Sequence, residues 1–239
     1  MTKRFSSNTK YLPKGLMILY EDRDILVVDK PAGLLTVATE TDKRRTVHFA
    51  LTDYIRKGCA KSRKQLFVVH RLDKQTSGVL IFAKTETAML NLKSGWKETE
   101  KEYLAVVNGR LAEPSGTITS YLTENKASQV VYTTTDTTKG KLSHTTYQVL
   151  RETKRFSLLK VHPLTGRKNQ IRVHLADLGH PVVGDRKYGK ANERYDRMAL
   201  HARSIRFNHP FSGKRLFFEA KVPEYFDKLV GQIPTTPLF

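Results

Sequence analysis

The stretch VVHRLDKQTSGVLIFAK, residues 68–84, has two apolar ends and a polar centre. The ends, Val68–Val69 and Val79–Ala83, are typical of strands buried in a sheet. At the centre a guanidinium, a carboxylate and an imidazole lie within four residues of the chain, a combination that is rare in ordinary turns. The stretch is therefore either a solvated loop that joins two core strands or a reactive site that those strands carry.

The composition is that of a soluble globular protein. The chain has 239 residues, of which 39% are hydrophobic and 27% charged, enough for one large domain or two closely packed halves. No apolar run approaches the roughly 18 residues of a transmembrane helix, and the N-terminus lacks the apolar region of a secretory signal. The single cysteine, Cys59, excludes an internal disulfide. We therefore expect a cytoplasmic protein without membrane contact.

The charge predicts a polyanionic partner. The chain carries 42 Lys and Arg against 23 Asp and Glu, a net charge of +19, with a pI near 10.0. Nucleic acid is favoured over a membrane because no strongly amphipathic basic helix with an aromatic face is present. Basic residues cluster at 57–64, 166–172 and 184–190, so they could share one face only after folding. The alternative is a basic protein that has no dedicated partner.

Strands outnumber helices in the sequence pattern, and most strands follow one another directly. This order favours an α+β fold with a large mixed, mainly antiparallel sheet in two packed halves with flanking helices. Helices are expected at 47–57, 85–97, 168–178 and 223–233. The expected strands are 25–30, 66–69, 79–83, 102–107, 117–122, 130–135, 145–151, 156–162, 200–207 and 216–222.

Motifs for nucleotide and metal cofactors are absent from the sequence. It contains no G-x-G-x-x-G, no G-x-x-x-x-G-K-[ST], no H-E-x-x-H and no G-x-S-x-G. The eight histidines do not group with carboxylates at ligand spacing. We therefore expect no cofactor and no metal, and any enzyme activity would depend on side chains alone.

Two segments carry candidate reactive groups. Arg71 and Asp73 are two residues apart, so in an extended segment they point the same way, and the guanidinium would keep the carboxylate charged. Spacing alone favours another reading, in which Asp73 caps the following turn. In the second segment Arg167 follows a Thr-Gly turn at the start of an expected helix. It could bind phosphate with Lys168, lie beside a carboxylate, or be a solvated helix start.

The two segments together resemble the RluA-type pseudouridine synthases. His70–Gly78 is similar to the H-R-L-D signature of that family, and Asp29–Gly33 resembles its K-P-x-G motif. Lys101–Gly109 resembles the K-x-Y-x-A motif, and Leu164–Asp185 resembles the T-G-R…Q-I-R-x-H…G-D block. The L-H-A…H-P segment is matched by residues 200–210. The blocks occur in the family's order and span about residues 16–225.

The resemblance implies a pseudouridine-synthase-like fold with a catalytic cleft across the sheet, and it implies a reaction. In this family the motif aspartate, here Asp73, is the nucleophile that isomerises uridine in RNA to pseudouridine without a cofactor. The carboxylate attacks either the ribose anomeric carbon or the uracil ring, or it removes a ribose proton in a glycal route. The sequence does not distinguish among the three routes.

The resemblance also assigns roles around Asp73. Tyr103 is placed against the target uracil, although from the sequence alone it reads as a strand-core aromatic. Arg167 becomes the cation that keeps Asp73 ionised, and Arg71 then helps to displace the flipped base. The residues expected to bind RNA are His70, which is structural in the alternative reading, Arg71, Lys74, Lys168 and Arg172.

Two features depart from the family pattern. Asn169 stands where histidine is common, so we assign it no proton-transfer role. Only about 15 residues precede the expected catalytic domain, too few for the small RNA-binding domain of many relatives. We therefore expect a basic flexible arm, 1–14, and one catalytic domain, 15–239, that binds RNA by itself as a monomer. The expected substrate is a stem-loop with a flipped uridine, in ribosomal RNA rather than transfer RNA.

Two alternatives remain at this stage. One is a non-catalytic RNA-binding module on the same fold, which predicts damage to the reactive residues that are in fact present. The other is an RNA hydrolase that uses His70 or His174, for which no second base is evident. Release of tritium from uridine carbon 5 without chain cleavage would distinguish a pseudouridine synthase from both alternatives.

Overall fold

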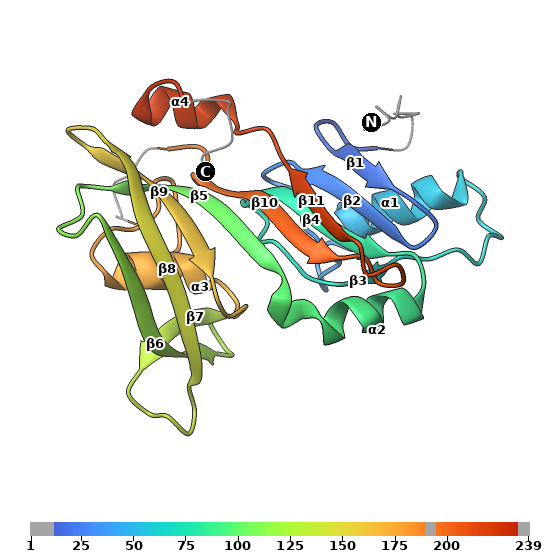
Figure 1. The fold of residues 1–239 in the computed structure, drawn as a ribbon, viewed down its shortest axis with the longest axis horizontal. Coiled ribbons are helices and arrows are strands. Elements are labelled where there is room, and N and C mark those ends of the chain that lie inside the picture. The colour runs from blue at the N-terminus through green and yellow to red at the C-terminus, as the bar shows by residue number, and fades with distance from the viewer. Residues whose placement is uncertain (1–11, 190–194, 234–239) are drawn as a thin grey trace. The chain divides into compact units, whose positions relative to one another are not determined.

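The computed structural model describes residues 12–189 and 195–233, which form two compact units (Figure 1). Unit 1 consists of residues 1–100 and 202–220, and unit 2 of residues 101–201 and 221–239. Most of the expected arm, 1–14, lies outside the described residues. The arm and the single domain 15–239 therefore stay predictions.

The sheet of unit 1 is built around two fully buried strands. All residues of β2 (Ile25–Lys30) and β4 (Ser77–Ala83) are buried, as their continuous apolar runs predict. The strand order is β1-β2-β4-β10-β11, with β3 also paired to β4. The pairs β1–β2, β2–β4, β3–β4 and β10–β11 are antiparallel. The remaining strands are β1 (Met17–Glu21), β3 (Phe67–Val68), β10 (Leu200–Asn208) and β11 (Arg215–Glu219).

The helices of unit 1 start at threonine caps. Helix α1 (Val47–Arg56) begins after Thr46, whose Oγ1 accepts a hydrogen bond from the amide of Phe49 over 3.0 Å. It ends at Lys57, which adopts a left-handed conformation. Helix α2 (Glu86–Ser94) begins after Thr85 in the same way, and a 3₁₀ turn, Trp96–Glu98, follows it. Leu92 of α2 packs in the core of this unit.

The sheet of unit 2 is antiparallel, and two of its neighbouring pairs, β6–β7 and β8–β9, are consecutive in the chain. Its order is β5-β9-β8-β6-β7, and every neighbouring pair in it is antiparallel. Helix α3 (Gln170–Asp177) lies against this sheet (Figure 1), and α4 (Glu224–Val230) follows Pro223. The strands are β5 (Glu100–Asn108), β6 (Ser115–Asn125), β7 (Val130–Thr134), β8 (Lys141–Glu152) and β9 (Phe156–Pro163).

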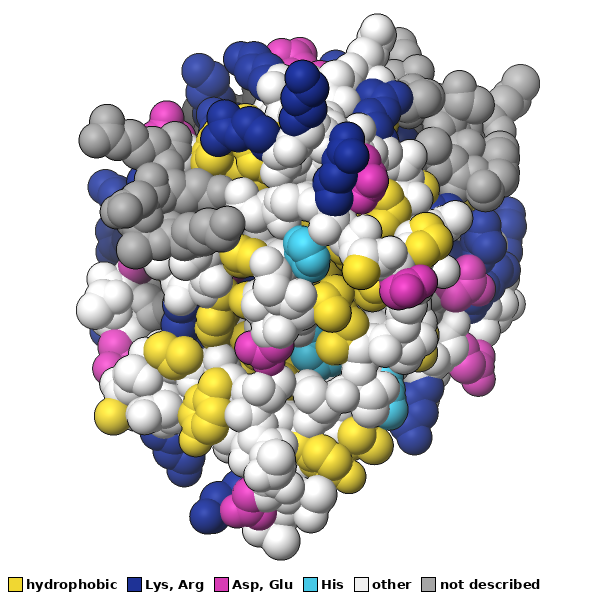
Figure 2. All heavy atoms as spheres, turned by 90° about the vertical axis from the view of Figure 1, so that its left-hand side faces the viewer, with side chains coloured by type: hydrophobic (Ala, Val, Ile, Leu, Met, Phe, Trp, Pro, Cys, Tyr) yellow, Lys and Arg dark blue, Asp and Glu magenta, His cyan; other side chains and the backbone are white. Residues whose placement is uncertain are grey.

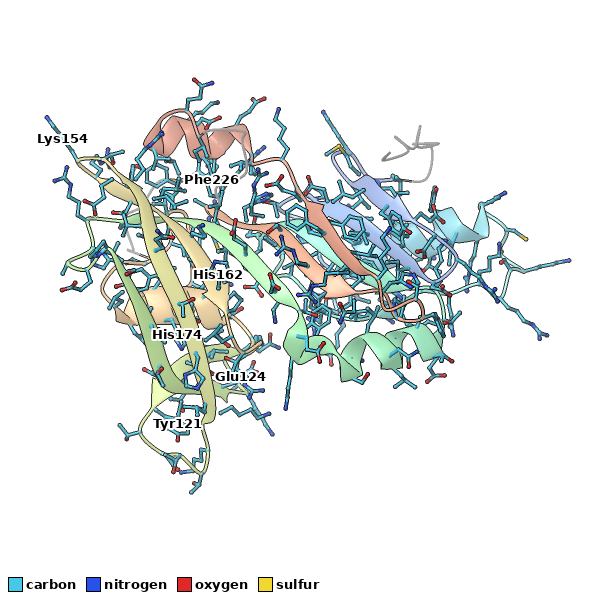
Figure 3. The ribbon with its side chains drawn as sticks, in the orientation of Figure 1. Tyr121, Glu124, Lys154, His162, His174 and Phe226 are labelled. Atoms are coloured by element: carbon cyan, nitrogen blue, oxygen red, sulfur yellow. The ribbon has the colours of Figure 1, made fainter. Side chains whose placement is uncertain are left out.

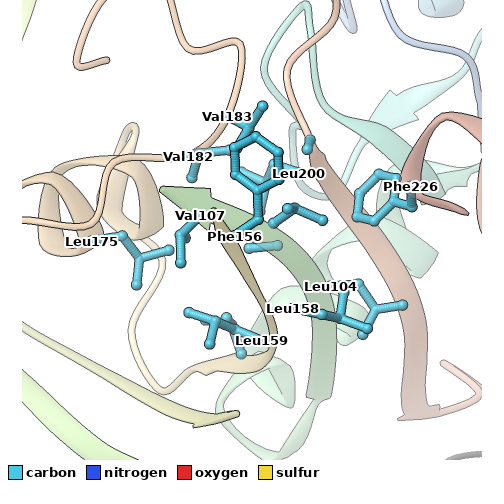
Figure 4. Packing of buried hydrophobic residues seen from close by; sticks show 14 of the residues in the cluster. Leu104, Val107, Phe156, Leu158, Leu159, Leu175, Val182, Val183, Leu200 and Phe226 are labelled. Carbon is cyan, nitrogen blue, oxygen red and sulfur yellow. The ribbon is translucent and has the colours of Figure 1, made fainter. Parts of the chain in front are cut away.

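The core of unit 2 joins its sheet to both helices. Leu159 of β9 and Leu175 of α3 are fully buried in one cluster. Phe226 of α4 is 1% exposed and belongs to the same cluster (Figure 4). A side chain of this size stabilises the folded state by about 2 to 3 kcal/mol when it is fully buried, so these residues fix both helices on the sheet.

The α+β class with mainly antiparallel strands is confirmed. Strand β1 was not predicted because it is a half-exposed strand with a bulge between Ile18 and Tyr20, which weakens the period of two. Helix α3 begins at Gln170, not 168, because Asn169 is left-handed. Strand β11 ends at Glu219, before the expected residue 222. The expected cleft across the sheet stays a prediction.

None of the helices within the described ranges is long and apolar enough to span a membrane.

Candidate active site

Asp73 lies in a loop of unit 1 between β3 and β4. Asp73 is half-buried, Arg71 and Lys74 are exposed, and Leu72 and Thr76 are buried. The amide of Thr76 donates to the carbonyl oxygen of Asp73 over 3.1 Å, which closes a tight turn. The loop is thus anchored by its buried residues while Arg71 and Lys74 remain accessible to a ligand.

His70 extends the pairing between the strands on either side of this loop. Its Nε2 accepts a hydrogen bond from the amide of Ile81 on β4 over 3.1 Å. The proton of a neutral imidazole in this bond lies on Nδ1. The ring also packs against Trp96, with centroids 5.0 Å apart. These contacts favour the structural alternative for His70 over an RNA contact.

Gly78, which ends the signature, is required by the strand beside it. Its φ is +113°, and a Cβ atom there would lie 2.1 Å from the carbonyl oxygen of Ala202 on β10. Only glycine fits such a close approach of two backbones. The glycine therefore sets where the loop ends and β4 enters the core.

A buried lysine lies beneath the Asp73 loop. Lys30 is 0% exposed, and its Nζ donates to the carbonyl oxygens of Pro31, Leu34 and Lys74 at 3.0, 2.8 and 3.2 Å. Burial lowers the pKa of Lys30 to about 7, although the nearby carboxylates of Asp73 and Asp29 act to raise it. Lys30 is thus tied both to the backbone and to the charge of the candidate nucleophile.

Tyr103 lies on β5 of unit 2, opposite Val161 of β9. Val161 in turn lies opposite Tyr147 of β8. Thr145, two residues before Tyr147 on the same strand, forms a hydrogen bond through its hydroxyl with His174 of α3. Because opposed and alternate residues share a face, Tyr103 lies on the α3 side of this sheet. The ring is half-buried against the core, so it is both a core aromatic and partly accessible.

The turn that carries Arg167 is held by a buried amide. Gln170 is 3% exposed, and its Oε1 accepts hydrogen bonds from the hydroxyl of Thr165 and the amide of Arg167, at 2.7 and 3.0 Å. Its Nε2 donates to the carbonyl oxygen of His144 and the hydroxyl of Thr145, each at 2.9 Å. Arg167 itself is exposed. The glutamine of the Q-I-R block therefore fixes the backbone that presents Arg167.

Arg172, an expected RNA contact, is paired with a buried carboxylate. Its Nε and Nη2 donate to Asp185 at 2.7 and 2.8 Å, and its guanidinium stacks on Tyr188, 5.0 Å from the ring centroid. Burial acts to raise the pKa of Asp185, but Arg172 and two backbone amides lower it below its ordinary value. This arrangement favours a structural role for Arg172, so RNA binding by it stays an unsupported prediction.

Asn169 joins the same group. Its Nδ2 donates to the hydroxyl of Tyr188 over 3.0 Å, and its Oδ1 accepts from Arg172 over 3.3 Å. Its φ is +54°, a conformation that asparagine tolerates well. The residue that replaces the common histidine thus shapes the start of α3.

Lys168 is accessible but has an acidic neighbour. It forms an ion pair with Glu124, which lies at the end of β6 (Figure 3). The two side chains are 46% and 37% exposed. Such exposed pairs contribute 1 kcal/mol or less, so a phosphate can compete for the ammonium.

His174 is a buried structural histidine. It is 0% exposed on α3, and its ring nitrogens contact the hydroxyls of Ser120 and Thr145 at 3.0 and 2.9 Å (Figure 3). Burial lowers the pKa of His174 to about 4, so the ring is neutral at physiological pH. A buried ring whose two nitrogens are both hydrogen-bonded within the protein cannot reach RNA. This argues against the hydrolase alternative for His174.

One group of side chains in the described ranges has the spacing of metal ligands: Asp22, Asp24 and His209. The Nε2 of His209 lies 3.0 Å from Asp22, whose other oxygen accepts the amides of Asp24 and Ile25 at 2.8 Å. The Nδ1 of His209 accepts the amide of Ser212 over 3.2 Å. These hydrogen bonds join the turn at residues 22–25 to the turn at residues 209–212, so the group has a structural role.

The expected site residues fall into two sets. His70, Arg71, Asp73 and Lys74 lie in one loop of unit 1. The other set, in unit 2, is Tyr103, Arg167, Lys168 and Arg172. On the face in Figure 2, the basic side chains lie mostly toward the upper edge and around the rim, and the centre is mainly apolar, uncharged or histidine.

Comparison with known proteins defines the class. Residues 24–177 match the RNA pseudouridylate synthase family model. Ribosomal large subunit pseudouridine synthase C of Buchnera aphidicola is 33% identical over 90% of this chain and 70% of its own, and that of Rickettsia bellii is 35% identical over 89% and 70%. The structure of Human RNA Pseudouridylate Synthase Domain Containing 1 is 30% identical, with a TM-score of 0.71 over 90% and 86%.

The chain belongs to the RNA pseudouridine synthase family. The resemblance to the RluA type is confirmed. The predictions that the protein is an isomerase and that it acts on RNA are confirmed with it. The matched family region contains the Asp73 loop and both Tyr103 and Arg167.

Proposed function

We propose that this enzyme isomerises uridine in ribosomal RNA and that Asp73 is its nucleophile. The observation that carries the proposal is the Asp73 loop, in which the half-buried Asp73 lies between two strands, β3 and β4, that pair with each other. Relatives named for the large ribosomal subunit support the choice of RNA.

The reaction rearranges bonds within one nucleotide. The bond between ribose and the uracil nitrogen breaks, and a bond from the same ribose carbon to uracil carbon 5 forms. The proton of carbon 5 leaves to water while the freed nitrogen gains one, so atoms and charge balance. Asp73 attacks the ribose, attacks the uracil ring or removes a ribose proton, and each of these steps requires the ionised carboxylate.

The remaining residues support that carboxylate and its substrate. On the family resemblance we assign Arg167 as the cation that serves the Asp73 carboxylate, and Tyr103 as a stacking face and a hydroxyl for uracil carbon 5. Arg71 and Lys74, both exposed in the Asp73 loop, bind the RNA backbone or fill the space left by the flipped base. Lys168 adds a further phosphate contact.

The substrate is a loop of structured RNA whose uridine flips out readily, and the enzyme acts as a monomer. The cytoplasm is the compartment we propose, since the one cysteine, Cys59, is a free and exposed thiol that a reducing environment preserves.

Mapping of pseudouridine in total RNA tests the choice of substrate. RNA from cells with the gene is compared with RNA from cells without it and from cells that express Asp73→Asn. We expect one or a few uridines of large-subunit ribosomal RNA to lose modification in both mutant samples. Loss confined to transfer RNA would overturn the ribosomal assignment but leave the chemistry intact.

A further inference from the structure

We infer that Thr36 is a positioning residue that fixes the backbone on the N-terminal side of Asp73. The inference rests on the proposed role of Asp73 as nucleophile. It concerns a residue that lies 37 positions earlier in the chain and belongs to none of the motifs discussed above.

One hydroxyl holds both backbone groups of the residue before Asp73. The Oγ1 of Thr36 donates to the carbonyl oxygen of Leu72 over 2.7 Å and accepts from the amide of Leu72 over 3.1 Å. Thr36 is 2% exposed and Leu72 is 6% exposed, so water cannot replace these bonds. Two bonds to one residue restrict both its position and the direction in which the chain continues to Asp73.

The other side of Asp73 is held from the same segment. The amide of Gly33 donates to the carbonyl oxygen of Lys74 over 2.8 Å, and Nζ of Lys30 donates to the same oxygen over 3.2 Å. Residues 30–36, which we call the loop clamp, therefore bond the chain both before and after the candidate nucleophile.

The loop clamp is itself attached to a helix. The amides of Val47 and His48, at the start of α1, donate to the carbonyl oxygens of Leu35 and Thr36 at 2.8 and 3.0 Å. Helix α1 is thus hydrogen-bonded to the loop clamp, and the loop clamp is hydrogen-bonded to the backbone on either side of Asp73. Placement errors of about 1 Å in a reacting group reduce rates by about a hundredfold, so such an attachment matters for catalysis.

Thr36 acts through position, not through contact with RNA, because its side chain is buried. Replacement by valine keeps the shape and removes the hydroxyl, while serine keeps the hydroxyl. Ser157→Ala is the matched control: Ser157 is 0% exposed in unit 2, and its hydroxyl donates to the carbonyl oxygen of Gly109 over 2.8 Å, outside the loop clamp and its attachment to α1.

The test is single-turnover tritium release from a large-subunit ribosomal RNA transcript labelled at uridine carbon 5, with enzyme in excess. Its amplitude reports the active fraction, and its rate constant reports the chemistry. We expect Thr36→Val to lower the rate constant 10- to 100-fold. Thr36→Ser should stay within about threefold of wild type, and Ser157→Ala should keep the wild-type rate constant at full amplitude. The Kd for RNA should change less than about twofold in every variant.

The outcomes separate this inference from the proposed function. If Asp73→Asn is inactive while Thr36→Val reacts at the wild-type rate, Thr36 is not a positioning residue. A loss of amplitude at an unchanged rate constant would also overturn the inference, because it reports folding alone. If Asp73→Asn retains activity, the proposed nucleophile is wrong. Should Thr36→Val not fold, Thr36→Cys replaces it, with an expected loss of at least about fivefold and a wild-type rate as the contrary result.

Discussion

At the scale of single residues, burial separates the arginines that hold the fold from those that can bind RNA. Arg172 has a side chain that is 12% exposed and pairs with Asp185, whose side chain is 0% exposed. Arg71 and Arg167 are exposed in turns whose backbones are held by other residues. The sequence shows all three as basic residues in family motifs, and only the fold shows that the guanidinium of Arg172 is already paired with a buried carboxylate.

The buried ion pair should be far more important for stability than the exposed one. We expect Asp185→Asn to lower the free energy of unfolding by about 3 kcal/mol, because it leaves the Arg172 charge buried without its partner. Lys168→Gln, which breaks the exposed pair with Glu124, should cost less than about 1 kcal/mol. Urea unfolding of both variants compares the two values; equal losses would contradict the distinction.

Gly78 should tolerate no side chain. Gly78→Ala would place a carbon 2.1 Å from the backbone of Ala202, and we expect a loss of about 3 kcal/mol or more together with slower tritium release. Gly213→Ala is the control for backbone strain alone, since its φ is +66° but no atom lies within 4 Å of the added carbon. That control should cost about 1 kcal/mol and leave activity unchanged. Wild-type stability of Gly78→Ala would show that β4 and β10 can separate at this point.

At the scale of elements, the sequence predicted the strands better than the contacts between them. The runs of β2 and β4 are continuous and apolar, and both strands form where expected. The edge strand β1 escaped prediction because it is half-exposed and bulged. The roles of Thr36 and Lys30 also escaped, because hydrogen bonds across more than thirty residues leave no local pattern in the sequence.

Helix α3 gives the fold a dependence on acid pH. The pKa of His174 is about 4 in the folded protein and about 6.5 in the unfolded chain. Between these values the unfolded chain binds more protons, so stability falls as the pH drops from about 6.5 toward 4, by at most about 3 kcal/mol. His174→Gln removes the titrating group. Its urea-unfolding free energy should therefore change less between pH 7 and pH 4.5 than that of wild type, and parallel curves would contradict this explanation.

At the scale of the whole molecule, the charge of +19 is the property that best matches an RNA substrate. The charge was evident from composition, and the family resemblance, which the comparisons confirm, was evident from the sequence motifs. The choice of uridine depends on the shape of the complex with RNA, and composition carries no record of that shape.

RNA affinity should weaken steeply with salt. We expect the logarithm of the binding constant to fall linearly with the logarithm of salt concentration, because each phosphate contact releases bound counterions. Arg71→Gln and Lys74→Gln should each make the slope shallower by about 0.7 to 1. Lys154→Gln, at the turn between β8 and β9 (Figure 3), is the matched control and should leave the slope unchanged. Binding that is insensitive to salt would contradict an electrostatic origin.

The central claim is that the Asp73 carboxylate performs the isomerisation. The most direct measurement compares wild type with Asp73→Asn, which keeps the size of the side chain but not its charge. RNA labelled with tritium at uridine carbon 5 is incubated with each protein, and released tritium and chain length are both followed. We predict that wild type releases tritium without chain cleavage and that Asp73→Asn, folded and binding RNA as before, releases none above background. Sustained release by Asp73→Asn would show that another group carries out the reaction.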